Sequence, residues 1–251
     1  MKAMILAAGL GTRLRPLTND RPKALVEVAG HTLLEITIAR LRQFGVREVI
    51  INAHHFSGLI MDYLKLKNNF NIRVEISRED ALLDTGGGLK KASWFFLEDS
   101  RPASFILHNV DVISTIDLGL MLESHQQNKA MATLAVQQRE TSRYLLFDEQ
   151  MQLCGRRIIK EQKTEMVKPV EQPKELAFTG IHIISPRLLE MMSEDGVFSI
   201  IESYLRLAGQ GEKILGYHAE GAYWRDLGKA ENIKAAVQDL KDHAFKIDQA
   251  L

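Results

Sequence analysis

The fold is decided by residues 2–13, Lys2-Ala3-Met4-Ile5-Leu6-Ala7-Ala8-Gly9-Leu10-Gly11-Thr12-Arg13, where a short apolar run leads directly into a glycine-rich loop. The run Lys2–Ala7 has the length and composition of a buried strand. Glycines after such a strand let the backbone approach a ligand closely, and their amides can face an anion. This stretch predicts an anion-binding loop at the end of a first strand.

The rest of the first half alternates strands and helices. Strands are predicted at Glu48–Asn52, Ile72–Ile76 and Ser104–His108, and helices at Leu33–Phe44, Phe56–Leu66 and Leu89–Phe96. This alternation predicts a three-layer, Rossmann-like α/β fold, with a mostly parallel sheet between two layers of helices. Ligands of such sheets bind beyond the carboxyl ends of the strands, so the loops after those ends are the informative ones.

The pattern changes beyond about residue 140. Short strands at Tyr144–Phe147, Leu153–Ile159 and Leu176–Ile184 predict a small antiparallel extension, followed by helices at Phe198–Ala208 and Lys229–Phe245. No repeat, low-complexity tract or linker separates the two parts. We therefore expect one domain over residues 1–251, with the binding core in 1–140 and the extension and last helices in 141–251.

Composition narrows the function classes. The 251 residues are 45% hydrophobic, enough for a sizeable core, and Lys+Arg and Asp+Glu both count 32. A balanced charge gives no field that would attract nucleic acid or an anionic membrane. No apolar run reaches the roughly 20 residues of a membrane span, and Cys154 has no second cysteine to pair with. We expect a cytoplasmic protein without nucleic-acid or membrane partners; a homo-oligomer is left open.

The glycine loop is accompanied by cations and a hydroxyl. Thr12 and Arg13 lie in the loop, and Lys23 follows in Pro22-Lys23-Ala24-Leu25, a set of donors that suits a triphosphate. The P-loop pattern is absent, and Leu14 stands where a dinucleotide-binding fingerprint has its third glycine. Taken alone, the loop is also compatible with a glycine turn flanked by surface cations.

The whole stretch from Leu6 to Leu25 resembles the signature of the sugar-1-phosphate nucleotidyltransferases. The resemblance implies a glycosyltransferase-A-like fold and Mg²⁺-dependent transfer of a nucleoside monophosphate from an NTP to a sugar 1-phosphate. It implies that Arg13 stabilises the triphosphate and that Lys23 bridges toward the reacting phosphates. The residues that it assigns to the nucleotide in this stretch are Leu6, Ala7, Ala8, Gly9, Gly11, Thr12, Arg13 and Lys23.

Two further segments are expected on the nucleoside. In Leu83-Asp84-Thr85-Gly86-Gly87-Gly88-Leu89, three glycines before a helix permit close approach to a flat ligand. The resemblance places Thr85 and Gly86 against the nucleoside, while flexible loop filler is the alternative. Asn52 ends a neighbouring strand and is expected to contact the nucleoside, whereas the adjacent His54 and His55 are interpreted as structural.

Two aspartates are candidate metal ligands. Asp111 follows the strand Ser104–His108, and Asp226 lies in Trp224-Arg225-Asp226-Leu227-Gly228. Each alone is compatible with a turn residue, but together they match the family's two metal-binding aspartates. Carboxylate oxygens suit Mg²⁺, which needs only one or two of them besides phosphates and water. The resemblance therefore implies Mg²⁺ on Asp111 and Asp226, with Arg13, Lys23 and Asp111 as the catalytic set.

The sugar side is predicted from Asn109 and from Phe178-Thr179-Gly180-Ile181, which resembles the strand at the family's sugar pocket. Thr179 and Gly180 are thus expected beside the sugar.

The chain also departs from the family's pattern. Val110 replaces the usual glycine before the first aspartate, and Lys229-Ala230 replaces a common Thr-Pro. Gln172, in Glu171-Gln172-Pro173, lacks the charge of the lysine in the family's Glu-Lys-Pro, so Lys168 or Lys174 is the candidate substitute for binding the sugar phosphate.

The substrates are ranked by resemblance. The short chain and its segment Leu83–Gly88 look most like compact, stand-alone members that make UDP-N-acetylmuramic acid from N-acetylmuramate 1-phosphate. UTP and an N-acetylated amino sugar phosphate are therefore expected, as in the synthesis of cell wall precursors. The alternatives are a guanylyltransferase for mannose or heptose 1-phosphate and a noncatalytic relative that senses sugar nucleotides.

Overall fold

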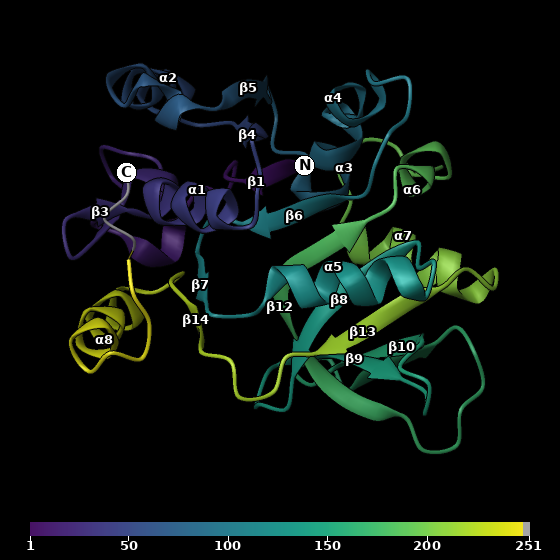
Figure 1. The fold of residues 1–251 in the computed structure, drawn as a ribbon. Helices are drawn as coiled ribbons and strands as arrows, with labels where there is room; N and C mark the ends of the chain where they lie inside the picture. The colour runs from purple at the N-terminus through teal and green to yellow at the C-terminus, as the bar shows by residue number, and fades with distance from the viewer. Residues whose placement is uncertain (248–251) are drawn as a thin grey trace.

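The structure is a computed structural model that describes residues 1–247, and its centre is a ten-stranded sheet (Figure 1). Its strands are β1 (Lys2–Leu6), β4 (Glu48–Ala53), β5 (Arg73–Arg78), β6 (Phe105–Asn109), β8 (Ala132–Gln137), β9 (Arg143–Phe147), β10 (Leu153–Ile158), β11 (Lys163–Met166), β12 (Lys174–Ile184) and β13 (Ile214–His218). The spatial order is β11-β10-β9-β12-β6-β1-β4-β5, with β8 beside β12 and β13 beside β8.

The sheet is parallel where the site lies. β1 pairs in parallel with β4 on one side and β6 on the other, so that Leu6 lies beside Asn52 and Asn109. β12 joins β6 in antiparallel orientation, and β9, β10 and β11 continue antiparallel from it. The predicted α/β fold, with a parallel core and an antiparallel extension, is confirmed.

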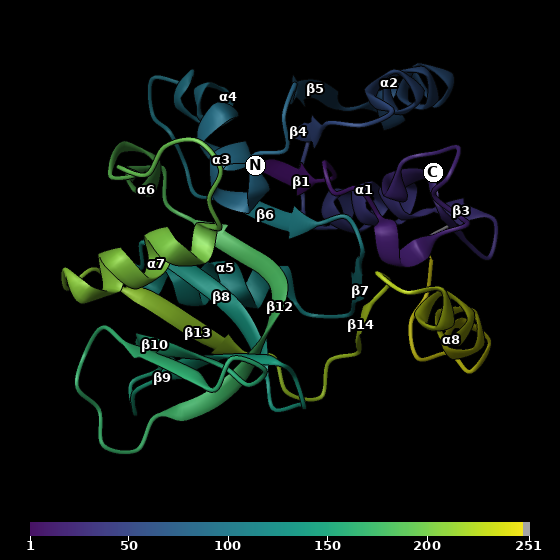
Figure 2. The ribbon, with the colours of Figure 1, turned by 180° about the vertical axis from the view of Figure 1, so that it is seen from behind.

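Helices cover both faces of the sheet (Figure 2). One side carries α1 (Leu33–Gln43), α2 (Ser57–Leu66) and α5 (Leu118–Gln127), and the other α3 (Asp84–Lys91), α4 (Ser93–Leu97), α6 (Arg187–Glu190) and α7 (Ile200–Gly209). The smaller elements are the pairs β2 (Glu27–Val28) with β3 (His31–Thr32) and β7 (Val112–Ser114) with β14 (Trp224–Asp226), the 3-10 helices η1 (Thr12–Leu14), η2 (Lys23–Leu25) and η3 (Asn68–Asn71), and α8 (Ala230–Lys241), which packs beside β14.

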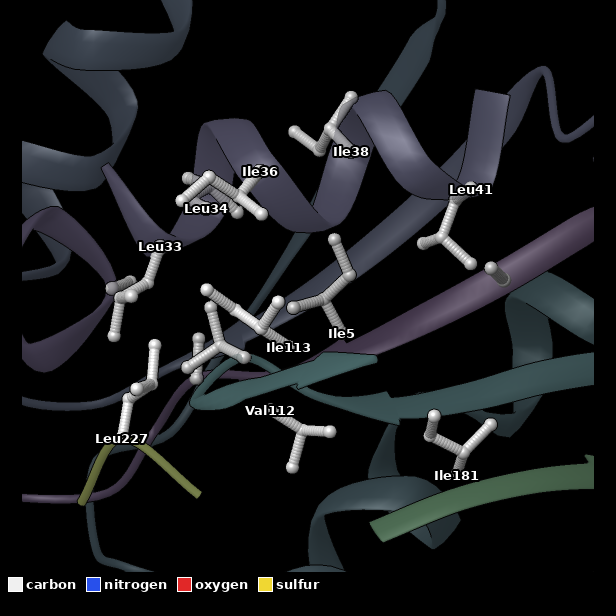
Figure 3. Packing of buried hydrophobic residues seen from close by; sticks show 14 of the residues in the cluster. Ile5, Leu33, Leu34, Ile36, Ile38, Leu41, Val112, Ile113, Ile181 and Leu227 are labelled. Atoms are coloured by element: carbon white, nitrogen blue, oxygen red, sulfur yellow. The ribbon is translucent and has the colours of Figure 1, made fainter. Parts of the chain in front are cut away.

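The sheet separates two hydrophobic cores. Along β1, Ala3 and Ile5 belong to the core beneath α1, whereas Met4 belongs to the core beneath α3 and α4. Figure 3 shows Ile5 on the face that α1 covers, together with Ile38. Burying an aliphatic side chain of this kind contributes about 1.5–3 kcal/mol. This double burial explains why β1 is a continuous apolar run, and it holds the following loop at the sheet edge.

Several boundaries differ from the predictions. The helix expected at Leu89–Phe96 begins earlier, at Asp84, and is divided at Ala92 into α3 and α4. The helix expected to reach Phe245 ends at Lys241, because the chain turns there and buries Phe245 against the core. Neither α5 nor the strands β8 and β13 were predicted. β8 pairs with both β12 and β13, so residues before and after 140 belong to one sheet.

Within residues 1–247, no helix combines the length and the apolarity that crossing a membrane requires.

Three buried histidines make the fold sensitive to acid. His182 is bonded to the Tyr204 hydroxyl at 2.8 Å, and His125 lies between Ser104 and Thr133. Burial lowers the pKa of His182 to about 3 and the pKa values of His125 and His108 to about 4. All three are therefore neutral in the folded protein at neutral pH.

We predict that the unfolding free energy falls below pH 6.5. Because the folded pKa values lie below the unfolded value, the unfolded chain binds more protons, and stability present above pH 6.5 is lost toward pH 4. The expected loss is about 2 kcal/mol for each histidine between pH 7.5 and 5.0. Urea denaturation at both pH values measures it. His125→Asn should reduce the loss, whereas a variant of the exposed His55, His55→Asn, should not; an unchanged loss in His125→Asn would contradict the assignment.

Candidate functional site

The glycine loop leaves the end of β1 in a defined conformation. Gly11 adopts a left-handed φ of 63°, which glycine tolerates and most side chains do not. A Cβ on Gly11 would lie 2.9 Å from the Thr18 side chain, and the Thr18 hydroxyl donates to the Gly11 carbonyl at 2.9 Å. The conformation of the loop is therefore held by contacts between its own residues Gly11 and Thr18.

Asn52 supports this loop from the neighbouring strand. Its Oδ1 accepts a hydrogen bond from the Ala7 amide at 2.7 Å, and its Nδ2 donates to Oε1 of Glu79 at 2.8 Å. Glu79 is itself buried, and its Oε2 accepts from the Leu83 amide at 3.1 Å. Asn52 thus uses both polar groups within the protein and positions the loop, while it also lines the cavity described below; its contact with a nucleoside stays a prediction. The role of Glu79 was not predicted from the sequence, because its neighbours in the chain are polar and give no sign that its side chain is buried.

The three glycines lie inside α3, contrary to the expectation of a loop before a helix. A Cβ on Gly86 would lie 2.3 Å from the Phe198 ring, and one on Gly87 would lie 2.3 Å from the Gly196 carbonyl. The Gly86 amide donates to the Phe198 carbonyl at 2.9 Å, and Thr85 accepts from the Ile200 amide at 3.0 Å. Gly86 and Gly87 therefore permit close packing of α3 against the segment that enters α7, whereas a Cβ on Gly88 would lie 2.8 Å from the side chains of Asn52 and Glu79.

Two cavities meet at the carboxyl ends of the parallel strands. The first, the nucleotide-side cavity of about 460 Å³, is lined by Leu6, Ala8, Gly9, Lys23, Asn52, Leu82, Asp84, Thr85, Asn109, Val110, Asp111 and Val197. The second, the sugar-side cavity of about 470 Å³, includes Asn109, Asp111, Arg139, Arg143, Thr179, Gly180, Glu202, Trp224 and Asp226 in its lining. Asn109 and Asp111 line both cavities. The predicted nucleotide residues Ala7, Gly11, Thr12, Arg13 and Gly86 line neither.

Asp111 and Asp226 are brought together by β7 and β14. Asp226 pairs with Val112 across these strands, and the Leu227 amide donates to the Asp111 carbonyl at 2.7 Å. Lys23 forms an ion pair with Oδ2 of Asp111, and Oδ1 of Asp226 accepts from the Gly228 amide. Lys23, Asp111 and Asp226 are thus joined although they are distant in sequence.

The donor set fits Mg²⁺. Asp111, in the turn before β7, and Asp226, on β14, both line the sugar-side cavity, and Lys23 shows that a cation is accommodated at Asp111. Across residues 1–247, no group of three or more His, Cys, Asp or Glu side chains could hold a metal by itself. Mg²⁺ in phosphate chemistry needs only one or two carboxylates, because phosphates and water complete its shell.

Arg13 is connected to this centre through Gly228. A Cβ on Gly228 would lie 2.7 Å from both Nη2 of Arg13 and Oδ1 of Asp226. Because Gly228 has no side chain, the guanidinium of Arg13 can lie beside Asp226. This packing explains why the Trp-x-Asp-x-Gly segment ends in glycine.

The sugar-side cavity also depends on a glycine. Gly180 has φ 83°, and a Cβ there would lie 2.7 Å from Nδ2 of Asn109. Thr179 is buried, and its hydroxyl donates to the Ala135 carbonyl at 2.9 Å, so its side chain is engaged within the protein. Its carbonyl accepts from Nε1 of Trp224 at 2.8 Å.

Arg139 is the main cation that the sequence did not reveal. Its guanidinium lies 3.7 Å from the centre of the Trp224 ring and donates to the Phe178 carbonyl. Burial lowers the pKa of Arg139, while the nearby charge of Asp226 opposes that shift. The proposed substitutes Lys168 and Lys174 do not line this cavity.

The sequence profile of the family described as "Nucleotidyl transferase" matches residues 2–243. This chain belongs to the nucleotidyl transferase family. The prediction of a nucleotidyltransferase enzyme is thereby confirmed. The chain is 32% identical to the N-acetylmuramate alpha-1-phosphate uridylyltransferase of Caulobacter vibrioides, over 96% of this chain and 97% of that protein.

Other nucleotidyl transferases are similar too. The mannose-1-phosphate guanyltransferase of Yarrowia lipolytica is 29% identical over 92% of this chain but only 62% of its own length. The crystal structure of HddC from Yersinia pseudotuberculosis complexed with GMP-PN has a TM-score of 0.75 at 23% identity, covering 95% of this chain and 99% of that one. That structural similarity supports the fold.

We predict that Gly228→Ala displaces Arg13 and lowers kcat/KM at least tenfold, because the added Cβ would overlap Nη2 of Arg13 and Oδ1 of Asp226. The fold should persist, as measured by circular dichroism. Gly58→Ala is the matched control, since a Cβ at Gly58 meets nothing within 4 Å. Kinetics of Gly228→Ala equal to those of Gly58→Ala would show that this packing does not position Arg13.

Proposed function

We propose that this nucleotidyl transferase joins a nucleoside monophosphate from an NTP to a sugar 1-phosphate, with Mg²⁺ on Asp111 and Asp226. The observation that supports this most is the position of Asp111, where the two cavities meet beside Lys23 and Asp226. Two separate substrates can then reach one centre, each through its own cavity.

The reaction requires control of negative charge more than a protein nucleophile. An oxygen of the sugar phosphate, ionised at neutral pH, attacks the α-phosphorus of the NTP. The bond from this phosphorus to the bridging oxygen breaks, and pyrophosphate leaves. Mg²⁺, when bound, would supply charge neutralisation at the reacting phosphates.

Lys23 and Arg13 perform the protein's part of that neutralisation. Lys23 lines the nucleotide-side cavity and contacts Asp111, so its ammonium group is within reach of phosphate oxygens bound beside that carboxylate. Arg13 lies beside Asp226 and balances charge developing on the departing pyrophosphate. Prepositioned cations of this kind are a major source of transition-state stabilisation.

UTP and N-acetylmuramate 1-phosphate are the proposed substrates. The Caulobacter relative that matches over nearly its full length supports this pair. A role in the cytoplasmic synthesis of cell wall precursors is part of the proposal. GTP with mannose or heptose 1-phosphate is the alternative, and the Yarrowia relative supports it for mannose 1-phosphate. A noncatalytic sensor is disfavoured, because Arg13, Lys23, Asp111 and Asp226 are all present and assembled.

A substrate matrix tests this proposal. Four NTPs are combined with N-acetylmuramate, N-acetylglucosamine, mannose and heptose 1-phosphates, and pyrophosphate release is measured with Mg²⁺. Turnover is expected with UTP and N-acetylmuramate 1-phosphate. Turnover confined to GTP would favour the guanylyl alternative, and no turnover with any pair would favour the sensor.

We predict that Asp111→Ala and Asp226→Ala each reduce Mg²⁺-dependent turnover at least about 100-fold, the order seen when a positioned charge stabiliser is removed. Isothermal calorimetry with Mg²⁺ and a non-hydrolysable NTP should show weakened metal binding. Asp62→Ala, which removes an exposed carboxylate on α2, is the control and should behave like the parent. Turnover within tenfold of the parent in either site variant would contradict the metal assignment.

A further inference from the structure

The sugar-side cavity contains more positive charge than one phosphate requires. Arg139, Arg143, Arg156 and Arg157 all line it. We propose that Arg143 binds a carboxylate carried by the sugar, so that this site selects acidic sugar 1-phosphates over neutral ones. This proposal rests on the proposed function, which supplies the sugar phosphate and its orientation.

Two of the four arginines are already neutralised. Arg156 forms an ion pair with Glu165 at 2.8 Å, and Arg157 pairs with Glu175. The first pair connects β10 to its neighbour β11, and the second reaches across β9 to β12. The guanidinium groups of Arg156 and Arg157 are therefore used in ion pairs within the sheet. The roles of Arg139 and Arg143 remain to be explained.

Arg139 is placed for the phosphate at C1 of the sugar. It stacks on Trp224, two residues before Asp226, and the charge of Asp226 acts on it. Its Nε is buried without a hydrogen-bond partner, a donor left unsatisfied at the metal end of the cavity. A phosphate oxygen bound by the metal would satisfy such a donor.

Arg143 lies elsewhere on the wall of the same cavity. On β9 it is paired with Ile158 of β10, and it shares a face of the sheet with Leu145 and Arg156. The side chain is exposed, and its guanidinium makes no hydrogen bond or ion pair with another residue in the described part of the chain. A free guanidinium in a ligand cavity is suited to a planar carboxylate, which it binds through two parallel hydrogen bonds.

The cavity also provides for the neutral groups of a sugar. Glu202, in the first turn of α7, is the one lining carboxylate besides Asp111 and Asp226. It can accept hydrogen bonds from hydroxyl or amide groups, whereas Leu145 and Ile158 offer apolar contact. These residues would bind a neutral amino sugar without Arg143. The unpaired guanidinium of Arg143 is therefore the feature of this wall that would favour an acidic sugar over a neutral one.

The test compares two sugar phosphates that differ by one acidic substituent. N-acetylmuramate 1-phosphate carries a lactyl carboxylate that N-acetylglucosamine 1-phosphate lacks. We expect Arg143→Gln to raise KM for the acidic substrate at least tenfold and to leave KM for the neutral one within twofold. Arg143→Lys should restore part of the loss. Arg101→Gln, at an exposed arginine outside both cavities, is the matched control.

Calorimetric binding of both sugar phosphates separates this proposal from the proposed function. If the parent binds the acidic compound more tightly and Arg143→Gln abolishes that preference, the proposal holds whatever the turnover. Equal affinity of the parent for the two compounds, or equal losses on both in Arg143→Gln, would overturn it. Absence of turnover in the substrate matrix would instead reject the proposed function.

Discussion

The pairing of β7 with β14 is the constraint on which the whole site depends. A short backbone ladder, extended by the bond from the Leu227 amide to the Asp111 carbonyl, brings a late segment of the chain against the end of β6. Asp226 thereby meets Asp111 and Lys23, and Gly228 meets Arg13. Without this ladder the cations and carboxylates would belong to unrelated loops, since no helix or strand of the core contains more than one of them.

Features encoded in short, local patterns could be predicted from the sequence. The apolar runs of β1, β4 and β6 indicate parallel strands, and the rule that ligands gather beyond their carboxyl ends places the loop after Ala7 and Asp111 at one edge. Asp226 could be assigned only through the family resemblance, because its position is set by pairing with a strand more than a hundred residues earlier.

Other roles depend on tertiary contacts that no local pattern reveals. Asn52 has a suitable position for a ligand contact, but its amide is used between Ala7 and the buried Glu79. The glycines of α3 resemble a ligand loop, yet each faces a close neighbour within the protein: Phe198 at Gly86, Gly196 at Gly87, and Asn52 with Glu79 at Gly88. Arg139 carries no motif, and only the folded chain brings it onto Trp224.

The junction of α3 with the entry to α7 has a mechanical consequence. Thr85 lines the nucleotide-side cavity and caps α7, whose first turn carries Glu202 into the sugar-side cavity. A second connection is the hydrogen bond from the Gly86 amide to the Phe198 carbonyl. Because Gly86 and Gly87 have no side chains, the two elements lie in direct contact there. One wall of each cavity therefore belongs to a single hydrogen-bonded unit, so that a change in the packing between α3 and α7 would alter both cavities together.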